Sequence, residues 1–266
     1  MSIFHVKNLC AGYGAKRVVD GLTFTLEGGS LTGVLGANGS GKTTLLRSIC
    51  GILRHDGECL LDGVRLEGLT ARQLSRLCSY IPQRSGVTID ISALDVVLMG
   101  FNPQLGLLEH PTPAMKQQAL AALDRAGIGD MAQTNYMHLS EGQKQLCILA
   151  RTLVTQGKLL LLDEPESALD FNFRYRMLEI IRAWVRHDSR LALVALHDPM
   201  LALNYCDSLL LLKDGRSLGV IRSGVDSFAR MEALLSELYG PVSLTSCTDR
   251  SGRKHIIMLN EGGRAP

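Results

Sequence analysis

Hydrophobic residues in the first part of the chain fall into short runs separated by glycine turns. Three runs predict β-strands: Phe4–Leu9, Val18–Leu26 and Cys59–Leu61. Between them, Ser30–Leu35 is typical of a short buried strand, and Thr44–Cys50 of the first turns of a helix. These patterns predict an N-terminal antiparallel β subdomain into which one strand–loop–helix unit is set.

The middle of the chain changes to helical spacing. Tyr80-Ile81 is a short strand ended by Pro82, and residues from Ser92 to about Tyr136 are typical of helices. Ser92 and Asp95 are potential caps for a helix over Val96–Gly100. We expect an inserted α-helical subdomain over about residues 84–140.

The rest of the chain alternates between helix and strand patterns. In order, these are a helix from Glu141, strand Leu159–Asp163, helix Phe171–Arg186, strand Arg190–Leu196, helix Pro199–Asn204 and strand Ser208–Leu212. Such alternation predicts a mostly parallel sheet covered by helices, which is an α/β fold. We expect one domain over residues 1–240. A β-hairpin tail over 241–266 would follow, with strands Val242–Cys247 and His255–Leu259.

Composition narrows the possible classes of protein. A chain of 266 residues with 46% hydrophobic and 20% charged residues is long enough to bury a full core. A net charge of +2 gives no reason to expect a nucleic-acid partner. No run approaches the roughly 18 apolar residues of a membrane span, and the N-terminus is unlike a signal peptide. The seven cysteines form no C-x-x-C pair, which argues against zinc and disulfides and favours a reducing cytosol.

One loop carries the strongest chemical signal. Residues 36–43, GANGSGKT, match G-x-x-x-x-G-K-[ST], the phosphate-binding P-loop, and they lie between a predicted strand and a predicted helix. Glycines let backbone N–H groups point at an anion, and the helix N-terminus adds positive potential. Lys42 can reach the β/γ-phosphates and Thr43 can ligate Mg²⁺. The alternative is a glycine turn that only happens to precede Lys-Thr.

Two acidic residues end a buried strand further along. Asp163 and Glu164 follow four leucines, and an acid at the carboxyl end of a central strand lies where ligands bind in α/β sheets. Asp163 is a candidate Mg²⁺ ligand, and Glu164 a candidate general base that would polarise the attacking water. The alternative is a solvated acidic turn.

A third motif, residues 139–143, LSEGQ, opens the predicted helix at Glu141. Ser140 is a natural N-cap and Gln143 lies three residues on, so a capping box is the structural interpretation. A capped helix end beside a glycine is equally an anion site.

With this motif the chain resembles the ATP-binding subunit of an ABC transporter. That family carries an L-S-G-G-Q signature shortly before the acidic strand, and further motifs match in order. Tyr13 matches the aromatic residue that stacks on adenine, Gln83 the Q-loop glutamine, residues 167–170 the D-loop, and His197 the switch histidine. Taken singly, the tyrosine, the glutamine and the histidine would each have an ordinary structural interpretation.

The resemblance implies a P-loop ATPase that hydrolyses ATP with Mg²⁺. Its catalytic residues would be Glu164, His197, Lys42 and Gln83, and its metal ligands Thr43, Gln83 and Asp163. In the family, the signature of one subunit faces the P-loop of a second, so that two ATP molecules lie in a head-to-tail homodimer. The implied nucleotide contacts are Tyr13, Gly36, Asn38, Gly39, Ser40, Gly41, Lys42, Thr43, Thr44, Ser140, Gly142, Gln143 and Asp170.

Two positions depart from the family pattern. Glu141 replaces the first signature glycine, and Glu166 stands where the family commonly has Thr. Glu141 would add negative charge near the γ-phosphate unless it points to solvent. Lys42, Glu164 and His197 are present, which argues against an inactive module.

The resemblance also implies partners and a location. Membrane permease subunits would dock near Gln83 and the helical subdomain, an extracytoplasmic solute-binding protein would act indirectly, and the chain would lie at the cytoplasmic face of the membrane. Residues 92–102 and the Tyr239-Gly240 pair are similar to the iron-siderophore, haem and cobalamin uptake group. The open alternatives are a soluble ABC ATPase of iron–sulfur cluster assembly and a subunit of an ABC exporter.

Overall fold

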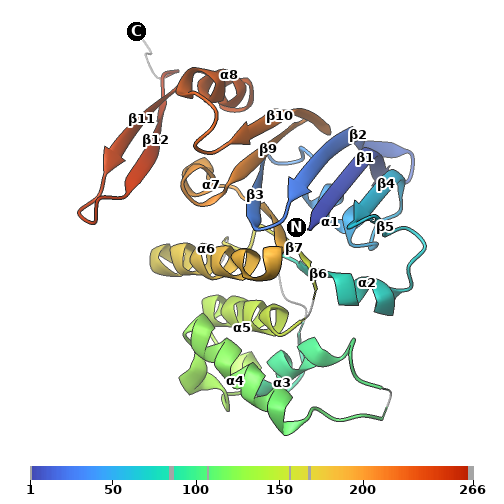
Figure 1. Cartoon of the computed structure of the whole chain (residues 1–266). Helices are drawn as coiled ribbons and strands as arrows, with labels where there is room; N and C mark the ends of the chain where they lie inside the picture. Colours follow the sequence, from blue (N-terminus) through green and yellow to red (C-terminus); the bar gives the residue numbers. More distant parts are fainter. Residues whose placement is uncertain (1, 84–86, 107, 156, 167–168, 263–266) are drawn as a thin grey trace.

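The chain folds into two main sheets, a C-terminal hairpin and a set of helices (Figure 1). The computed structural model describes residues 2–83, 87–106, 108–155, 157–166 and 169–262. The strands are β1 (Ile3–Tyr13), β2 (Lys16–Glu27), β3 (Ser30–Leu35), β4 (His55–Leu61), β5 (Val64–Arg65), β6 (Cys78–Ile81), β7 (Leu159–Asp163), β8 (Leu191–Ala195), β9 (Ser208–Lys213), β10 (Arg216–Arg222), β11 (Val242–Thr248) and β12 (Lys254–Asn260). The α-helices are α1 (Lys42–Ile49), α2 (Ala71–Leu77), α3 (Ala93–Leu98), α4 (Pro113–Ala126), α5 (Glu141–Leu153), α6 (Phe171–Arg186), α7 (Pro199–Tyr205) and α8 (Phe228–Tyr239).

The central sheet has six strands in the order β10-β9-β3-β8-β7-β6. All neighbours from β9 to β6 are parallel, and β10 adds an antiparallel edge. Register places Asp163 of β7 opposite Ala195 of β8, and Ala195 opposite Val34 of β3. The residues that follow these strands therefore meet at one edge of the sheet, as the alternating pattern predicted.

A second sheet of four strands, in the order β2-β1-β4-β5, is antiparallel throughout. It confirms the predicted N-terminal antiparallel subdomain. Figure 1 shows it beside the central sheet, with α1 close to both.

The central sheet is buried on both faces, which explains why its strands are nearly all apolar. In β7, Leu160 and Leu162 face a core shared with α3 to α6, whereas Leu159 and Leu161 face a core shared with α1 and the antiparallel sheet. Successive side chains of a strand point to opposite faces, so a run of leucines supplies both cores at once.

The inserted helical region lies between β6 and β7 along the chain. Helices α3, α4 and α5 pack against one another below the sheet in Figure 1. Ser92 and Thr112 cap α3 and α4 by accepting hydrogen bonds from Asp95 N and Met115 N. Helix α3 begins at Ala93 and not at the predicted Val96, because Asp95 is the third residue of a capping box and not an N-cap.

Among these strands and α-helices, four were not predicted from the sequence, namely β5, α2, β10 and α8. The arginines of α2 make contacts outside their own helix. Arg76 Nε donates to Pro103 O at 2.8 Å, and Arg72 Nε donates to the same oxygen at 3.4 Å. They tie α2 to the loop that follows α3.

The C-terminal hairpin, β11 and β12, docks on α7. The side-chain amide of Asn204 pairs with the backbone of Ile256: Nδ2 donates to Ile256 O at 2.9 Å, and Oδ1 accepts from Ile256 N at 2.8 Å. Val242 and Leu244 are buried in the core that α8 also lines. In the part of the chain that the structure describes, no helix has the length and apolar content to cross a membrane.

Truncation of a core side chain on β8 tests the two-faced sheet. Leu193 is 0% exposed, so Leu193→Ala should lower the free energy of unfolding by about 2–5 kcal/mol through lost burial and a residual cavity. Val225→Ala, at a position 75% exposed, is the matched control and should change it by less than about 0.5 kcal/mol. Urea denaturation followed by circular dichroism measures both values, and equal effects would contradict the assignment of Leu193 to the core.

Candidate active site

The predicted phosphate-binding loop joins β3 to α1 at the carboxyl end of the central sheet. Gly39 and Gly41 have φ angles of 80° and 105°, in the left-handed region that favours glycine. Gly36 has no space for a side chain, since a Cβ there would lie 2.4 Å from Leu212 O. The backbone path of the loop therefore depends on all three glycines.

The N-terminus of α1 differs from those of its neighbours. Gly41 is its N-cap, with no side-chain cap hydrogen bond and no acidic residue in the first turn. Helices α2, α3 and α5 each begin with a capping box. The first N–H groups of α1 thus keep their positive potential for another acceptor, which suits a phosphate.

Lys42 is a buried cation at this end of α1, with its side chain 5% exposed. Its ammonium donates to Gly36 O at 2.8 Å and Ala37 O at 3.4 Å, and lies 3.5 Å from Glu164 Oε1. The carboxylate balances the buried charge. A bound phosphate would compete with Glu164 for the same ammonium.

The other loop residues differ in exposure. Ser40 and Thr44 are buried, and Asn38 is exposed. Ser40 Oγ is buried without a hydrogen-bond partner among the described residues. An unpaired polar atom inside a glycine-rich loop fits a site that receives a polar ligand.

Asp163 lies at the end of β7 and holds two hydroxyl groups. Thr43 Oγ1 donates to its Oδ1 at 2.9 Å, and the Tyr80 hydroxyl donates to its Oδ2 at 3.1 Å. Burial raises the pKa of Asp163 above its ordinary value, although these two hydrogen bonds oppose the shift. The predicted metal ligands Thr43 and Asp163 are therefore adjacent, and their oxygen donors suit Mg²⁺.

Glu164 follows directly and contacts two other predicted site residues. Gln83 Nε2 donates to Glu164 Oε2 at 3.0 Å, while Oε1 faces Lys42. Glu164 has a positive φ of 47°, which is uncommon for a residue other than glycine. Its backbone N–H donates to Ala195 O at 3.1 Å, which anchors the residue to the neighbouring strand in this conformation.

His197 lies just past the end of β8, with an exposed side chain. Its backbone N–H donates to Glu166 Oε1 at 2.8 Å. Glu166 is 2% exposed, and its Oε2 accepts no hydrogen bond from the described residues. Burial raises the pKa of Glu166, so the residue that departs from the family pattern is a buried acid supporting the predicted switch histidine.

The signature residues form the capping box that the sequence predicted. Gln143 N donates to Ser140 Oγ at 3.2 Å, and Ser140 N donates to Gln143 Oε1 at 2.9 Å. Glu141 has a side chain 73% exposed and pairs with Lys144 at 2.9 Å. Its charge therefore points to solvent.

Tyr13 and Asp170 come from the end of β1 and from the start of α6. Tyr13, 48% exposed, ends β1, and its hydroxyl together with that of Tyr80 raises the pKa of Arg47 by hydrogen bonding. Asp170 caps α6, with Oδ1 accepting from Phe173 N at 3.1 Å. Ser167 and Ala168 of the predicted D-loop lie outside the described residues.

The predicted residues therefore form two groups. Lys42 and Gln83 both contact Glu164, and Thr43 contacts Asp163. These two sets of contacts are adjacent, because Lys42 and Thr43, like Asp163 and Glu164, are neighbours along the chain. By contrast, the described hydrogen bonds of the signature serine and glutamine, and the side-chain hydrogen bond of Asp170, stay within their own helix ends.

Sequence reasoning missed two residues that support this set. Tyr80 contacts Asp163, and Gln145 Nε2 donates to Gln83 O at 2.8 Å. Tyr80 is near the carboxyl end of β6, next to β7, so the rule that located Asp163 applied to it as well. No local signal in the sequence points to Gln145, since α5 only approaches Gln83 in the folded chain.

Removal of the Glu166 charge tests the burial of this acid. A buried acid with a raised pKa disfavours folding where it is ionised, and the penalty disappears as pH falls and both states become protonated. Glu166→Gln should therefore raise the free energy of unfolding at pH 7, and the gain should shrink toward acidic pH. Urea denaturation at several pH values without nucleotide measures it, and a gain independent of pH would contradict the assignment.

Comparison with known proteins gives the same family by two routes. The model of the ABC transporter family matches residues 19–167. A probable iron chelatin transport ATP-binding protein of Helicobacter pylori is 34% identical, over 80% of this chain and 84% of its own length. The hemin import ATP-binding protein HmuV of Bordetella pertussis is 36% identical, over 79% of this chain and 82% of its own length.

Solved structures agree with the sequence relatives. An ABC transporter of the metal-chelate type, in an inward-facing conformation, has a chain with a TM-score of 0.79 and 26% identity, covering 98% of this chain and 99% of its own. A nucleotide-free ATP-binding cassette, 21% identical with a TM-score of 0.77 over 89% of this chain and 96% of its own, shows the same fold. The family model matches more than half of the chain, and both relatives are more than 30% identical to it over most of its length. This chain therefore belongs to the ATP-binding subunits of ABC transporters.

Proposed function

We propose that the chain is the ATP-hydrolysing subunit of an importer for a metal chelate of the iron-siderophore, haem or cobalamin type. The adjacent contacts of Thr43 with Asp163 and of Lys42 with Glu164 carry the ATPase part. The cargo part is supported by relatives named for iron chelatin, hemin and cobalamin import. Importer ATPase subunits act as dimers with membrane permeases, and we infer the same assembly here.

Nucleotide binding would rest on the P-loop and the end of α1. The N–H groups of residues 39–44 and the Lys42 ammonium would bind the phosphates, and Tyr13 would stack on adenine. Thr43 and Asp163 would hold Mg²⁺, with Gln83 beside them. The ion would supply positive charge against the β- and γ-phosphate oxygens.

Hydrolysis would depend on Glu164 as the base that polarises the attacking water. In the structure this carboxylate is held by Lys42 and Gln83. Phosphate contacts with Lys42 would free Oε1 from its ion pair, so binding of ATP and release of the base are linked. His197 would contact the γ-phosphate, and Glu166 would hold the backbone of His197 in place.

The second subunit would complete the site. Ser140, Gly142 and Gln143 lie at the start of α5, and the exposed Asp170 at the start of α6. In a head-to-tail dimer these helix ends would face the partner's P-loop. Glu141 would not oppose the phosphate, because its side chain is exposed and paired with Lys144.

Permease subunits would dock on the helical region near Gln83, over about residues 84–140. Exposed apolar side chains at Ile89, Met99 and Leu108 support this surface. A groove between α3 and the start of α4, lined by Leu98, Met99 and Pro113 among others, adds a concave apolar contact. The chain would then lie at the cytoplasmic face of the membrane, held by the permease.

Replacement of the base separates binding from hydrolysis. Glu164→Gln should slow ATP hydrolysis by about 10²–10⁴-fold. It should also tighten ATP binding, since a neutral amide no longer competes with phosphate for Lys42. Phosphate release and equilibrium binding of a fluorescent ATP analogue measure the two effects. The exposed Glu179→Gln is the matched charge control, and equal hydrolysis rates in the two variants would refute the role of Glu164.

Identification of the partners tests the importer assignment. A tagged chain recovered from detergent-solubilised native membranes should bring a polytopic permease and a solute-binding protein, and uptake of an iron chelate or cobalamin by the reconstituted complex should require ATP. Recovery with soluble iron–sulfur scaffold proteins would instead support the assembly ATPase. Outward movement of cargo would support an exporter. Neither result would affect the ATPase chemistry.

A further inference from the structure

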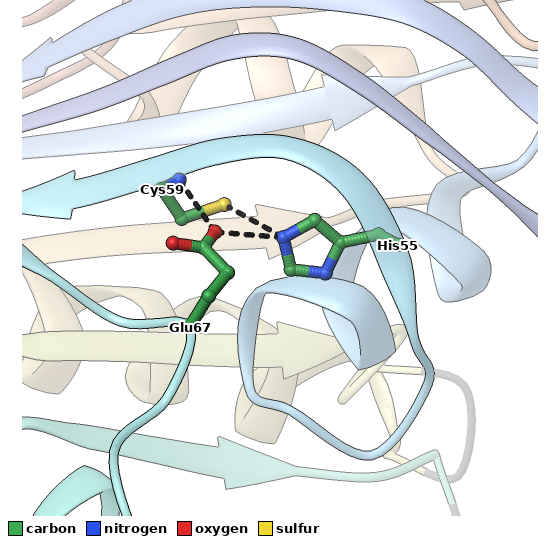
Figure 2. Close-up of side chains that lie close together, drawn as sticks. All are labelled: His55, Cys59 and Glu67. Atoms are coloured by element: carbon green, nitrogen blue, oxygen red, sulfur yellow. Dashed lines mark hydrogen bonds and ion pairs between the residues drawn. The ribbon is translucent and has the colours of Figure 1, made fainter.

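Three metal-binding side chain types converge on the antiparallel sheet, outside the nucleotide site (Figure 2). His55 and Cys59 come from β4, and Glu67 from the segment between β5 and α2. One ligand atom from each lies within 4.8 Å of the other two. His55 Nε2 is 2.8 Å from Glu67 Oε1 and 3.7 Å from Cys59 Sγ.

The backbone brings these residues together by two features. Gly57, with a φ of 96°, lies between His55 and Cys59. At this point the pairing of β4 with β1 shifts in register. A Cβ at Gly57 would lie 2.4 Å from Asn8 O, so only glycine allows this close approach. The segment after β5 then folds alongside β4, with Leu66 N donating to Cys59 O at 2.9 Å.

Glu67 is fixed against the strand by its own carboxylate. Oε1 accepts the N–H of Cys59 at 2.7 Å as well as the contact with His55. Oε2 is buried and accepts no hydrogen bond from the described residues, with Arg65 Nε 3.8 Å away as an ion-pair partner. Burial favours a raised pKa for Glu67, but its hydrogen bonds, led by His55, outweigh this and hold the pKa below its ordinary value.

The geometry argues against a nucleophilic cysteine. In a nucleophile–base–acid arrangement the thiol and the carboxylate meet different nitrogens of the histidine, whereas here both face Nε2. Cys59 is 0% exposed. Its burial, with Glu67 adding to it, raises the pKa of the thiol far above its usual range, so the unliganded thiol is not reactive.

We propose that His55, Cys59 and Glu67 form a binding site for a divalent cation of the zinc class. Imidazole nitrogen, thiolate sulfur and carboxylate oxygen are the zinc ligands in proteins. A thiolate and a carboxylate balance a divalent charge, so the ion and its three ligands together carry no net charge, which favours burial. The cysteine spacing had argued against a zinc site. It did so because the C-x-x-C pattern does not describe a ligand set of three different residue types on a bent strand.

Three protein ligands leave a fourth position, and a cavity of about 560 Å³ opens beside the cluster. His55 and Glu67 line it, together with Cys50, Cys78 and Tyr80. Sites with three protein ligands keep a water or another small ligand at the open position. The cavity supplies both the entry path and the space for that ligand.

Binding would join β4 to the segment that leads into α2. A cation that binds the folded chain and not the unfolded one stabilises the fold by mass action. The proposed role is thus a metal-dependent clamp on the antiparallel sheet, independent of the nucleotide.

Titration of the nucleotide-free full chain with Zn²⁺, followed by calorimetry, tests the proposal. We expect one equivalent bound with a raised melting temperature. Cys59→Ser, His55→Ala and Glu67→Gln should each lower the affinity for Zn²⁺ by about a hundredfold or more. This exceeds the effect of changing a residue that only supports a metal ligand. Co²⁺ in place of Zn²⁺ should give a thiolate charge-transfer band that Cys59→Ser abolishes.

Cys247→Ser, at an exposed cysteine on β11, is the matched control and should leave binding and the cobalt band unchanged. Circular dichroism and the metal-free melting temperature show whether each variant folds, so lost binding is not confused with lost structure. Zn²⁺ affinity that is the same in wild type and in folded Cys59→Ser would overturn the proposal. So would a cobalt spectrum with no thiolate band.

Discussion

A parallel sheet buried on both faces is the constraint on which the rest of the structure depends. Strands β3, β8 and β7 run side by side, and every residue of β7 and β8 is buried. Backbone groups in such an interior must pair with neighbouring strands, which locks the register. Because the strands are parallel and in register, their carboxyl ends reach the same edge. The P-loop, Asp163, Glu164 and His197 meet there as a consequence of packing.

Charge balance at that edge shapes the resting site. Lys42 cannot remain buried without an anion, and Glu164 supplies it at 3.5 Å. Gln83 holds the other oxygen of the same carboxylate. Glu164, Lys42 and Gln83 are thus one connected unit, so a change at any of them reaches the others through short contacts.

The antiparallel sheet uses polar chemistry differently. Its cluster of His55, Cys59 and Glu67 is placed by a glycine in a bent strand and by pairing with the following segment, outside the candidate nucleotide site. The hydrogen bonds that organise it also bring three metal-binding atoms to one point. One chain thereby holds a candidate anion-binding loop and a candidate cation site, each built from local backbone geometry.

The sequence alone determined the fold class, the P-loop and the two acids, because these depend on local patterns: a glycine run before a helix, leucines before acids, and alternating strands and helices. It also predicted the capping box at Ser140. Only the tertiary structure decided which residues from distant segments contact one another. The contact of Tyr80 with Asp163, the support of His197 by Glu166 and the convergence at His55 depend on register and on a bent strand. No local pattern encodes such contacts, since they join residues far apart along the chain or, on β4, residues that an unbent strand would hold apart.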